Sequence, residues 1–456
     1  MPVMEEKKLK DEKLREKAAE ISIVEGSAAS VMDGFGSKYI TPYALALGAT
    51  NTHIGLLSAL PQLLGTISQL FGSRAIEKHS RKKILLWFVT IQAILWLPLI
   101  AVGIAYFFFG LSAVISSVLV IVLYTILSVA GSFVGPAWSS WMKDIVIKNA
   151  DSYFGRRSKV CGIVGLLSTG IAGLVLYFLT PFNVFAGFAI ILFVAFLGRS
   201  FSAYMFTKKY EPKLQHSEGY YFSFWQFLRK MSSNNFGRFA IFWALVSFST
   251  AVASPFFAVY ELKNLGLNYF AFTAILVAPI ITTLLTIQFW GRLIERYGNV
   301  AIFKFSGYLI WVIPALWVLT IFMASLHTSF VVIYLILVES FSGIVWAGFN
   351  LATWTFMFHA ITRERLALIS AYTGILNSLG AFIGATLGGA LSSFSGVALG
   401  ISGIVWIFIL SALLRFLSVT LFVHRIKEVR EVVPAKNLNR IFLSEFIGLF
   451  WLRRAT

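Results

Sequence analysis

Long apolar runs alternate with short polar and charged segments along almost the whole chain. Twelve of these runs are long enough for a helix of about 20 residues to cross a lipid bilayer. They cover approximately residues 23–48, 53–76, 84–108, 111–135, 160–180, 183–206, 237–260, 268–291, 301–324, 328–352, 366–391 and 399–423. The pattern predicts an all-α membrane protein with twelve transmembrane helices.

Composition supports this prediction. Hydrophobic residues make up 58% of the 456 positions and charged residues only 13%, whereas a soluble domain usually carries about 25% charged residues. The net charge of +18 would suit a nucleic-acid partner, but the basic residues lie in the short segments between apolar runs. Anionic headgroups and membrane orientation explain that placement, so we expect membrane lipids and no nucleic acid as partners.

The basic residues also predict the orientation. If the N-terminus lies in the cytoplasm, 34 of the 38 Lys and Arg fall on the cytoplasmic side. This asymmetry predicts that both termini are cytoplasmic in a multi-pass protein of the cell membrane. The charged residues 1–22 lack the short apolar core of a signal peptide and are expected to form a cytoplasmic segment.

The two halves of the chain resemble each other. Pro61 and Pro279 lie 218 positions apart, as do Glu77 and Glu295. A repeat of this length predicts two six-helix bundles. We therefore divide the chain into an N-terminal bundle at 23–206, a cytoplasmic linker at 207–236, a C-terminal bundle at 237–425 and a cytoplasmic tail at 426–456. Within the tail, residues 438–452 are too short to span and predict an amphipathic helix on the inner leaflet.

The loops that follow the second and eighth spans carry a repeated motif. Residues 291–298 read GRLIERYG and residues 73–83 read SRAIEKHSRKK. They resemble the Gly-x-Leu-Ala-Asp-Arg-x-Gly-Arg-Arg motif of the major facilitator superfamily, with glutamate in place of aspartate in both copies. The resemblance covers about residues 21–425. It implies two pseudo-symmetric six-helix bundles and secondary transport of a small solute by alternating access.

In that family the first, fourth, seventh and tenth helices line a central cavity. The resemblance therefore places Asp33, Lys38, Glu339 and Asn350 at the solute pathway. Glu339 lies about 18 Å from either end of its span, near the bilayer midplane. Ionisable groups at this depth are costly unless they have a role, so we expect Glu339 to be the main proton-coupling carboxylate and Asp33 the second.

Three other charges within spans allow more than one interpretation. Lys38 is expected either to balance one of the acids or to meet an anionic solute, and the sequence does not choose between these roles. Arg199 and Arg415 occupy equivalent places in the sixth and twelfth spans, near their cytoplasmic ends. We expect a structural role for both arginines.

The repeated loops predict a gate. Glu77 and Lys78, like Glu295 and Arg296, form an acid–base pair at the cytoplasmic end of a span. Such an acid can hold one access state by pairing with a neighbouring helix, and breaking the pair releases that state. The bases at 81–83 are interpreted as solvated charges that only set the topology.

The sequence contains no pattern typical of an enzyme or of a cofactor site. It lacks a phosphate-binding loop, and its six histidines are not spaced as metal ligands. We therefore expect a proton-coupled monomeric transporter with no cofactor, whose partners are a small solute, protons and lipids. A non-transporting receptor or a lipid flippase on the same fold is the alternative.

Overall fold

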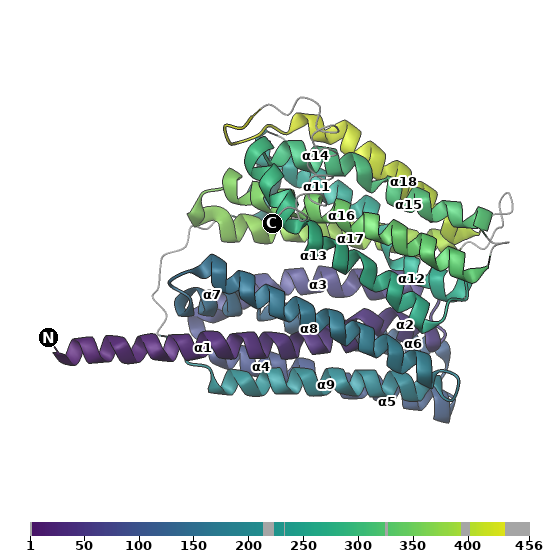
Figure 1. Cartoon of the computed structure of the whole chain (residues 1–456), viewed down its shortest axis with the longest axis horizontal. Coiled ribbons are helices and arrows are strands. Elements are labelled where there is room, and N and C mark those ends of the chain that lie inside the picture. The colour runs from purple at the N-terminus through teal and green to yellow at the C-terminus, as the bar shows by residue number, and fades with distance from the viewer. Residues whose placement is uncertain (1, 213–222, 232, 324–326, 394–401, 434–456) are drawn as a thin grey trace, which may run out of the picture. The chain divides into compact units, whose positions relative to one another are not determined.

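The computed structural model describes residues 2–212, 223–231, 233–323, 327–393 and 402–433, and the regular structure within them is helical (Figure 1). Eleven segments of these residues are long and apolar enough to cross a membrane. The predicted all-α membrane fold is therefore confirmed. The amphipathic helix predicted at 438–452 lies outside the described residues.

The first half of the chain begins with a helix that is longer than the predicted first span and is interrupted at Gly36. Its helices are α1 (Pro2–Phe35), η1 (Ser37–Tyr39), α2 (Ile40–Ala46), α3 (Asn51–Lys78), α4 (Arg81–Ile94), α5 (Trp96–Phe109), α6 (Ala113–Phe133), α7 (Gly135–Ile145), α8 (Ala150–Leu179) and α9 (Val184–Lys208). Polar side chains start several of them: Thr50, Ser80, Ser112 and Asn183 each accept a hydrogen bond from a backbone N–H of the first turn.

The second half follows a similar order. Its helices are α10 (Phe224–Lys230), α11 (Asn235–Ala251), η2 (Ser254–Phe256), α12 (Phe257–Val259), η3 (Tyr260–Asn264), α13 (Tyr269–Tyr297), α14 (Asn299–Ile310), α15 (Val312–Val318), η4 (Leu319–Met323), α16 (Thr328–Ala360), α17 (Arg363–Ser393), α18 (Gly403–Phe422) and η5 (Val423–Arg425). Pro61 lies inside α3 and Pro279 inside α13, so the two prolines occupy corresponding helices of the two halves.

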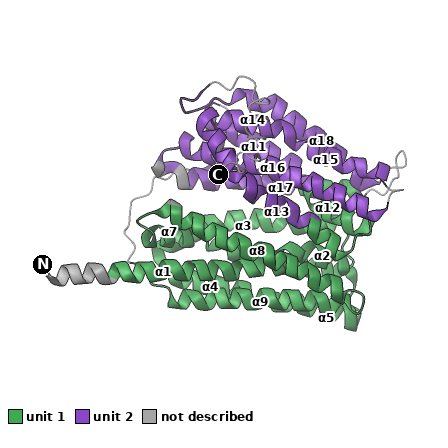
Figure 2. Cartoon of the chain, in the orientation of Figure 1, with its two compact units in different colours: residues 1–218, 254–274, 385–394 green, residues 219–253, 275–384, 395–456 purple. Residues whose placement is uncertain are grey.

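The chain divides into two compact units (Figure 2). Unit 1 contains residues 1–218, 254–274 and 385–394, and unit 2 contains residues 219–253, 275–384 and 395–456. In unit 1, α1 packs against α8 and α9, and α3 packs against α6. In unit 2, α14 packs against α16, and α11 against α18.

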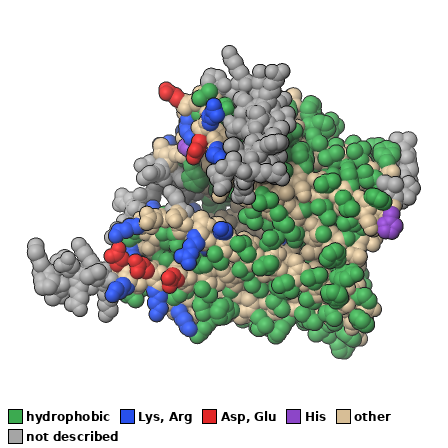
Figure 3. Space-filling view, viewed as in Figure 1, with side chains coloured by type: hydrophobic (Ala, Val, Ile, Leu, Met, Phe, Trp, Pro, Cys, Tyr) green, Lys and Arg blue, Asp and Glu red, His purple; other side chains and the backbone are tan. Residues whose placement is uncertain are grey.

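The surface of unit 1 separates charge from apolar area. Charged side chains gather at one end of unit 1, and hydrophobic side chains cover the flank beyond them (Figure 3). Large apolar residues such as Phe108, Val114 and Leu167 are exposed on this unit. A surface of this kind suits contact with lipid tails. We call the charged region, formed by residues 11–20, 78–83, 143–157 and 207–212, the basic end of unit 1.

Candidate functional site

A polar cavity of about 370 Å³ lies among the helices of unit 1. Asp33 from α1, Gln92 from α4, Tyr124 and Ser128 from α6, and Arg199 from α9 all line it. The cavity therefore brings together one acid, one base and several hydrogen-bonding groups from four helices. Of the residues that the sequence places at the solute pathway, it contains Asp33.

The local fold at Asp33 follows from the glycines around it. A Cβ atom on Gly34 would lie 2.5 Å from Cβ of Ser168, and one on Gly36 would lie 2.3 Å from the Trp96 ring. Glycine at both positions therefore lets α1 approach its neighbours closely. Because α1 ends at Phe35, Asp33 and Lys38 lie on different helical segments.

Lys38 is exposed in η1 and does not line the cavity, but it lies near enough to Asp33 to interact with it electrostatically. The Asp33 carboxylate accepts a hydrogen bond from the Ser37 hydroxyl at 3.1 Å.

Unit 2 holds the other acid predicted within a span. The Trp317 indole N–H donates to Oε1 of Glu339 at 2.8 Å, and Glu339 interacts electrostatically with Arg415. Arg415 is 1% exposed and donates to Ser411 Oγ and to the carbonyls of Ile310 and Thr250. These contacts agree with the structural role expected for Arg415.

Asn350, also predicted at the pathway, is exposed on α16 in unit 2. Its backbone carbonyl accepts a hydrogen bond from the Thr353 hydroxyl. Glu339 and Asn350 thus share one long helix, three turns apart, whereas Asp33 and Lys38 belong to unit 1.

The sequence analysis overlooked Glu25, an acid within the first predicted span. Glu25 is 2% exposed, and its Oε1 accepts hydrogen bonds from the Trp138 indole N–H at 3.0 Å and the Arg157 guanidinium at 3.2 Å. The Ser22 hydroxyl donates to the same oxygen. Glu25 therefore joins α1 to α7 and α8 near the basic end. Its signal was the same as that of Asp33, a carboxylate inside an apolar run.

The predicted gate residues lie at the ends of their helices. Glu77 and Lys78 are exposed at the end of α3, and Glu295 and Arg296 are exposed at the end of α13. The guanidinium of Arg296 stacks over the ring of Tyr297 at 5.3 Å. Their role as a gate stays a prediction, because it concerns a change between two states.

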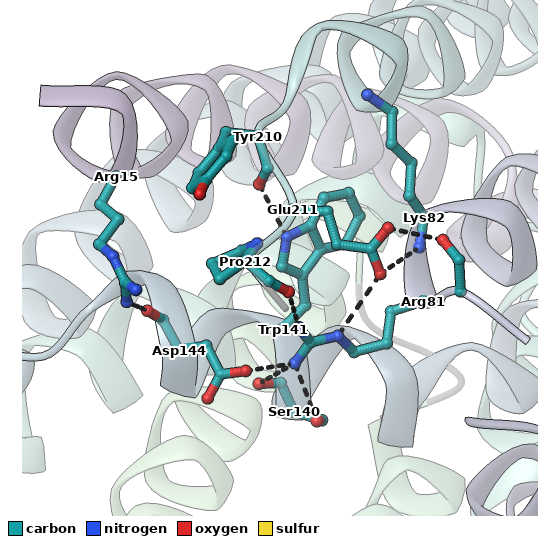
Figure 4. Close-up of polar contacts among 10 residues, drawn as sticks. Arg15, Arg81, Lys82, Ser140, Trp141, Asp144, Tyr210, Glu211 and Pro212 are labelled. Carbon is teal, nitrogen blue, oxygen red and sulfur yellow. Dashed lines mark hydrogen bonds and ion pairs between the residues drawn. The ribbon is translucent and has the colours of Figure 1, made fainter. Parts of the chain in front are cut away.

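The interpretation of Arg81 as a solvated charge is wrong. Arg81 is 1% exposed and lies in a cluster that joins α4, α7 and the start of the linker (Figure 4). Its guanidinium pairs with Asp144 at 2.6 Å and donates to the carbonyls of Pro212 at 2.7 Å and Ser140 at 3.1 Å. Sequence reasoning failed here because residues 209–212 fold back over the start of α4 and exclude water from Arg81.

Lys82 also has defined contacts, since its ammonium donates to the carbonyls of Thr207 and Lys209. Lys83 is exposed, as expected for all three bases. The indole N–H of Trp141 donates to the Tyr210 carbonyl, which fixes the linker at a further point.

One contact at the basic end recurs in the second half of the chain. Glu211 accepts hydrogen bonds from the Lys82 backbone N–H at 3.3 Å and the Ser80 hydroxyl at 2.5 Å, at the N-terminus of α4. Glu428 accepts one from the Val300 backbone N–H at 2.8 Å, at the N-terminus of α14. Glu211 follows α9, the sixth span of the first half, and Glu428 follows α18, the sixth span of the second half. Each acid complements the positive N-terminal end of the helix that starts the third span of its half, α4 or α14. The repeat therefore extends into the linker and the tail.

Lys209, the residue after α9, is fully buried at the basic end. Its ammonium lies 3.1 Å from Met142 Sδ and over the rings of Trp141 and Phe206. Burial lowers the pKa of Lys209 to about 8, because the charged form is poorly solvated there. By contrast, the hydrogen bond from Tyr210, followed by the one from Arg15, lowers the pKa of the Asp11 carboxyl.

The opposite end of unit 1, which we call the far end, joins segments from both halves of the chain. Tyr39 donates to the Thr169 carbonyl at 2.7 Å and shares a hydrogen bond of 2.8 Å with the Thr273 hydroxyl. Asn51 donates to the Ser392 carbonyl. A Cβ atom on Gly55 would meet the Ala385 carbonyl at 2.5 Å, so α3 and α17 approach each other closely here.

Among the described residues, no group of three or more His, Cys, Asp or Glu side chains is arranged to hold a metal ion.

A family model described as Major Facilitator Superfamily matches residues 26–385. No curated protein matches the chain by sequence.

Several solved transporters share the fold. A mutant form of the nucleoside transporter NupG has 14% identity and a TM-score of 0.70, over 90% of this chain and 100% of its own. A bacterial homologue of the iron transporter ferroportin, in its inward-facing state, has 14% identity and a TM-score of 0.64, over 91% and 98%. A bacterial homologue of the human lysosomal transporter Spinster has 14% identity and a TM-score of 0.63, over 91% and 99%. At this identity the likeness concerns the fold alone.

Proposed function

Since the chain belongs to the major facilitator superfamily and is a multi-pass membrane transporter, we propose that it moves a small solute by alternating access, driven by a proton gradient. The observation that carries this proposal is the polar cavity of unit 1, where Asp33 and Arg199 face a common space among apolar helices. Charged groups within spans are costly and mark solute or ion pathways.

The contacts at the far end support a gate. Tyr39, Thr273, Asn51 and Ser392 tie segments from both halves of the chain together within unit 1. These hydrogen bonds are few and join uncharged groups, each contributing about 1 kcal/mol. We propose that they close the external mouth in one access state and break in the other.

The basic end of unit 1 is assigned to the cytoplasm in this proposal. Its lysines and arginines suit the inner leaflet, in line with the bias of the sequence. Labelling of single cysteines from outside the cell is expected near Asn51 and Lys263 and not near Ser80. The opposite pattern would reverse the orientation.

Glu339 is the proposed coupling carboxylate. It lies within α16, is half-buried, accepts the Trp317 indole N–H and interacts with Arg415. A carboxylate held this way can take up a proton without losing its position. Asp33 is the second acid, because it faces the cavity where a solute would change its surroundings.

The proposal is tested by a solute-library screen on the purified protein followed by flux measurements. A solute that binds the folded state raises the melting temperature, by an amount that grows with its concentration. Proteoliposomes that contain the protein are expected to take up that solute faster than protein-free ones. Binding without flux would favour a receptor and refute transport.

A further inference from the structure

The two arginines related by the repeat differ in how their guanidinium groups are used. Arg415 makes three hydrogen bonds with groups of unit 2. Arg199 is 8% exposed, and its recorded hydrogen bond is the one from Nη1 to Ser202 Oγ at 3.3 Å. Its Nε is buried and has no hydrogen-bond partner among the described residues. Arg199 therefore makes fewer hydrogen bonds among the described residues than Arg415 does at the equivalent position of the repeat.

Arg199 lines the same cavity as Asp33 and Gln92. Gln92 is 6% exposed, and its Oε1 has no hydrogen-bond partner in the part of the chain that the structure describes. Arg199 and Gln92 thus bring a cation and an amide, each with few hydrogen bonds of its own, to the wall of one cavity.

The charges around the cavity do not neutralise each other by contact. Within the part of the chain that the structure describes, neither an ion pair nor a hydrogen bond joins Asp33 to Arg199. The carboxylate of Asp33 is exposed to the cavity and takes its hydrogen bond from Ser37. Asp33 and Arg199 thus line one cavity of about 370 Å³, and no direct contact between them is present among the described residues.

We propose that this cavity binds a small zwitterion, a solute with a carboxylate for Arg199 and a protonated amine for Asp33. Arg pairs with a carboxylate through strong, charge-assisted hydrogen bonds, and Arg199 lines the cavity while its guanidinium donates to Ser202 Oγ. The Gln92 side chain lines the same cavity and adds a polar group to its wall. A solute with one charge would bring an opposite charge into direct contact with either Asp33 or Arg199 but not with both, and a neutral polyol with neither.

The size of the cavity suits this class. Small-molecule sites usually have volumes of about 300–1,000 Å³, and this cavity is near the lower limit. The proposal rests on the proposed transport function and narrows its solute to the size and charge pattern of an amino acid.

The test uses the purified full-length protein and the twenty common L-amino acids as probes. Each is added at about 5 mM while thermal unfolding is followed, because binding to the folded state raises the melting temperature. Every amino acid that does so is compared with two analogues, its amide, which lacks the carboxylate, and its deaminated acid, which lacks the amine. We expect each analogue to bind about tenfold more weakly or worse, since each loses a charge-assisted contact.

Two variants assign the contacts. Arg199→Gln is expected to weaken binding of the amino acid and to leave binding of its amide unchanged. Asp33→Asn is expected to weaken binding of the amino acid and to leave binding of its deaminated acid unchanged. A variant that folds poorly would bind every ligand more weakly. A loss of binding for only one of the two analogues therefore distinguishes the loss of a ligand contact from a loss of folding. Lys83→Met, at an exposed position outside the cavity, is the control and is expected to bind like the wild type.

The wild-type ligand series decides the proposal even when a variant fails to fold. If the deaminated acid or the amide binds as tightly as its parent, the two-charge site is refuted. If no amino acid raises the melting temperature, the proposal is also refuted. A different solute found in the wider library would then leave the transport proposal standing.

Discussion

Replacing Arg81 by methionine tests whether the basic end of unit 1 depends on a buried charge. Methionine keeps most of the side-chain volume but removes the guanidinium. The substitution leaves the Asp144 carboxylate without its ion pair and the Pro212 carbonyl without its donor.

The size of the effect follows from these contacts. Removing one partner of a buried ion pair costs about 3–5 kcal/mol. Asp144 is 34% exposed, so water will solvate part of its charge, and we expect a loss of about 3 kcal/mol. For a unit of about 250 residues, 1 kcal/mol shifts the melting temperature by about 2–4 °C, which gives a decrease of about 6–12 °C.

The assay is thermal unfolding of the purified protein, followed by tryptophan fluorescence, with Lys83→Met as the matched control. Lys83 lies two residues further on and is exposed, so its loss is expected to change the free energy of unfolding by less than about 0.5 kcal/mol. Equal melting temperatures for Arg81→Met and Lys83→Met would refute the inference that the Arg81 cluster holds the linker on unit 1.

Three further predictions concern other parts of the chain. Lys209→Met should stabilise the protein at pH 7 by up to about 3 kcal/mol, because the pKa of Lys209 falls from 10.5 to about 8 on folding. Between these two pKa values the unfolded chain binds one proton more than the folded chain, so the free energy of unfolding of the wild type rises from about pH 8 to about pH 10.5. The difference in free energy of unfolding between K209M and the wild type therefore narrows over this range. A difference that is constant with pH would contradict the prediction. Gly55→Ala should destabilise the protein by about 1–3 kcal/mol, because the added Cβ meets a backbone carbonyl of α17. Gly170→Ala is the control and should not destabilise the protein, because nothing lies within 4 Å of its Cβ. Equal melting temperatures for the two variants would rule out the close contact at the far end. Glu77→Gln or Glu295→Gln should change spin-label distances across the cytoplasmic mouth, and unchanged distances in both variants would make these acids ordinary surface charges.

The fold was predictable from the sequence because a membrane span leaves a strong local signal. A run of about 20 apolar residues must form a helix in lipid, whatever its neighbours are. The predicted second span at 53–76, for example, lies within α3, and the ninth at 301–324 overlaps the segment Asn299–Met323 over residues 301–323.

Contacts between distant segments were less predictable. Arg81 and Lys83 look alike in the sequence, and only the path of residues 209–212 buries one and leaves the other exposed. Arg199 and Arg415 are equivalent in the repeat, yet their hydrogen bonds differ because their surroundings have diverged. Such differences depend on which backbone carbonyls and side chains lie opposite, and one sequence alone does not specify them.

A transport assay shows whether protons and solute are coupled at Glu339. The wild type and Glu339→Gln are reconstituted into proteoliposomes, and uptake of the solute that most stabilises the purified protein is measured with and without an imposed pH gradient. We predict that the gradient drives accumulation by the wild type, whereas Glu339→Gln only exchanges solute across equilibrated membranes. Accumulation by Glu339→Gln under the same gradient would contradict this prediction and place the coupling on another residue.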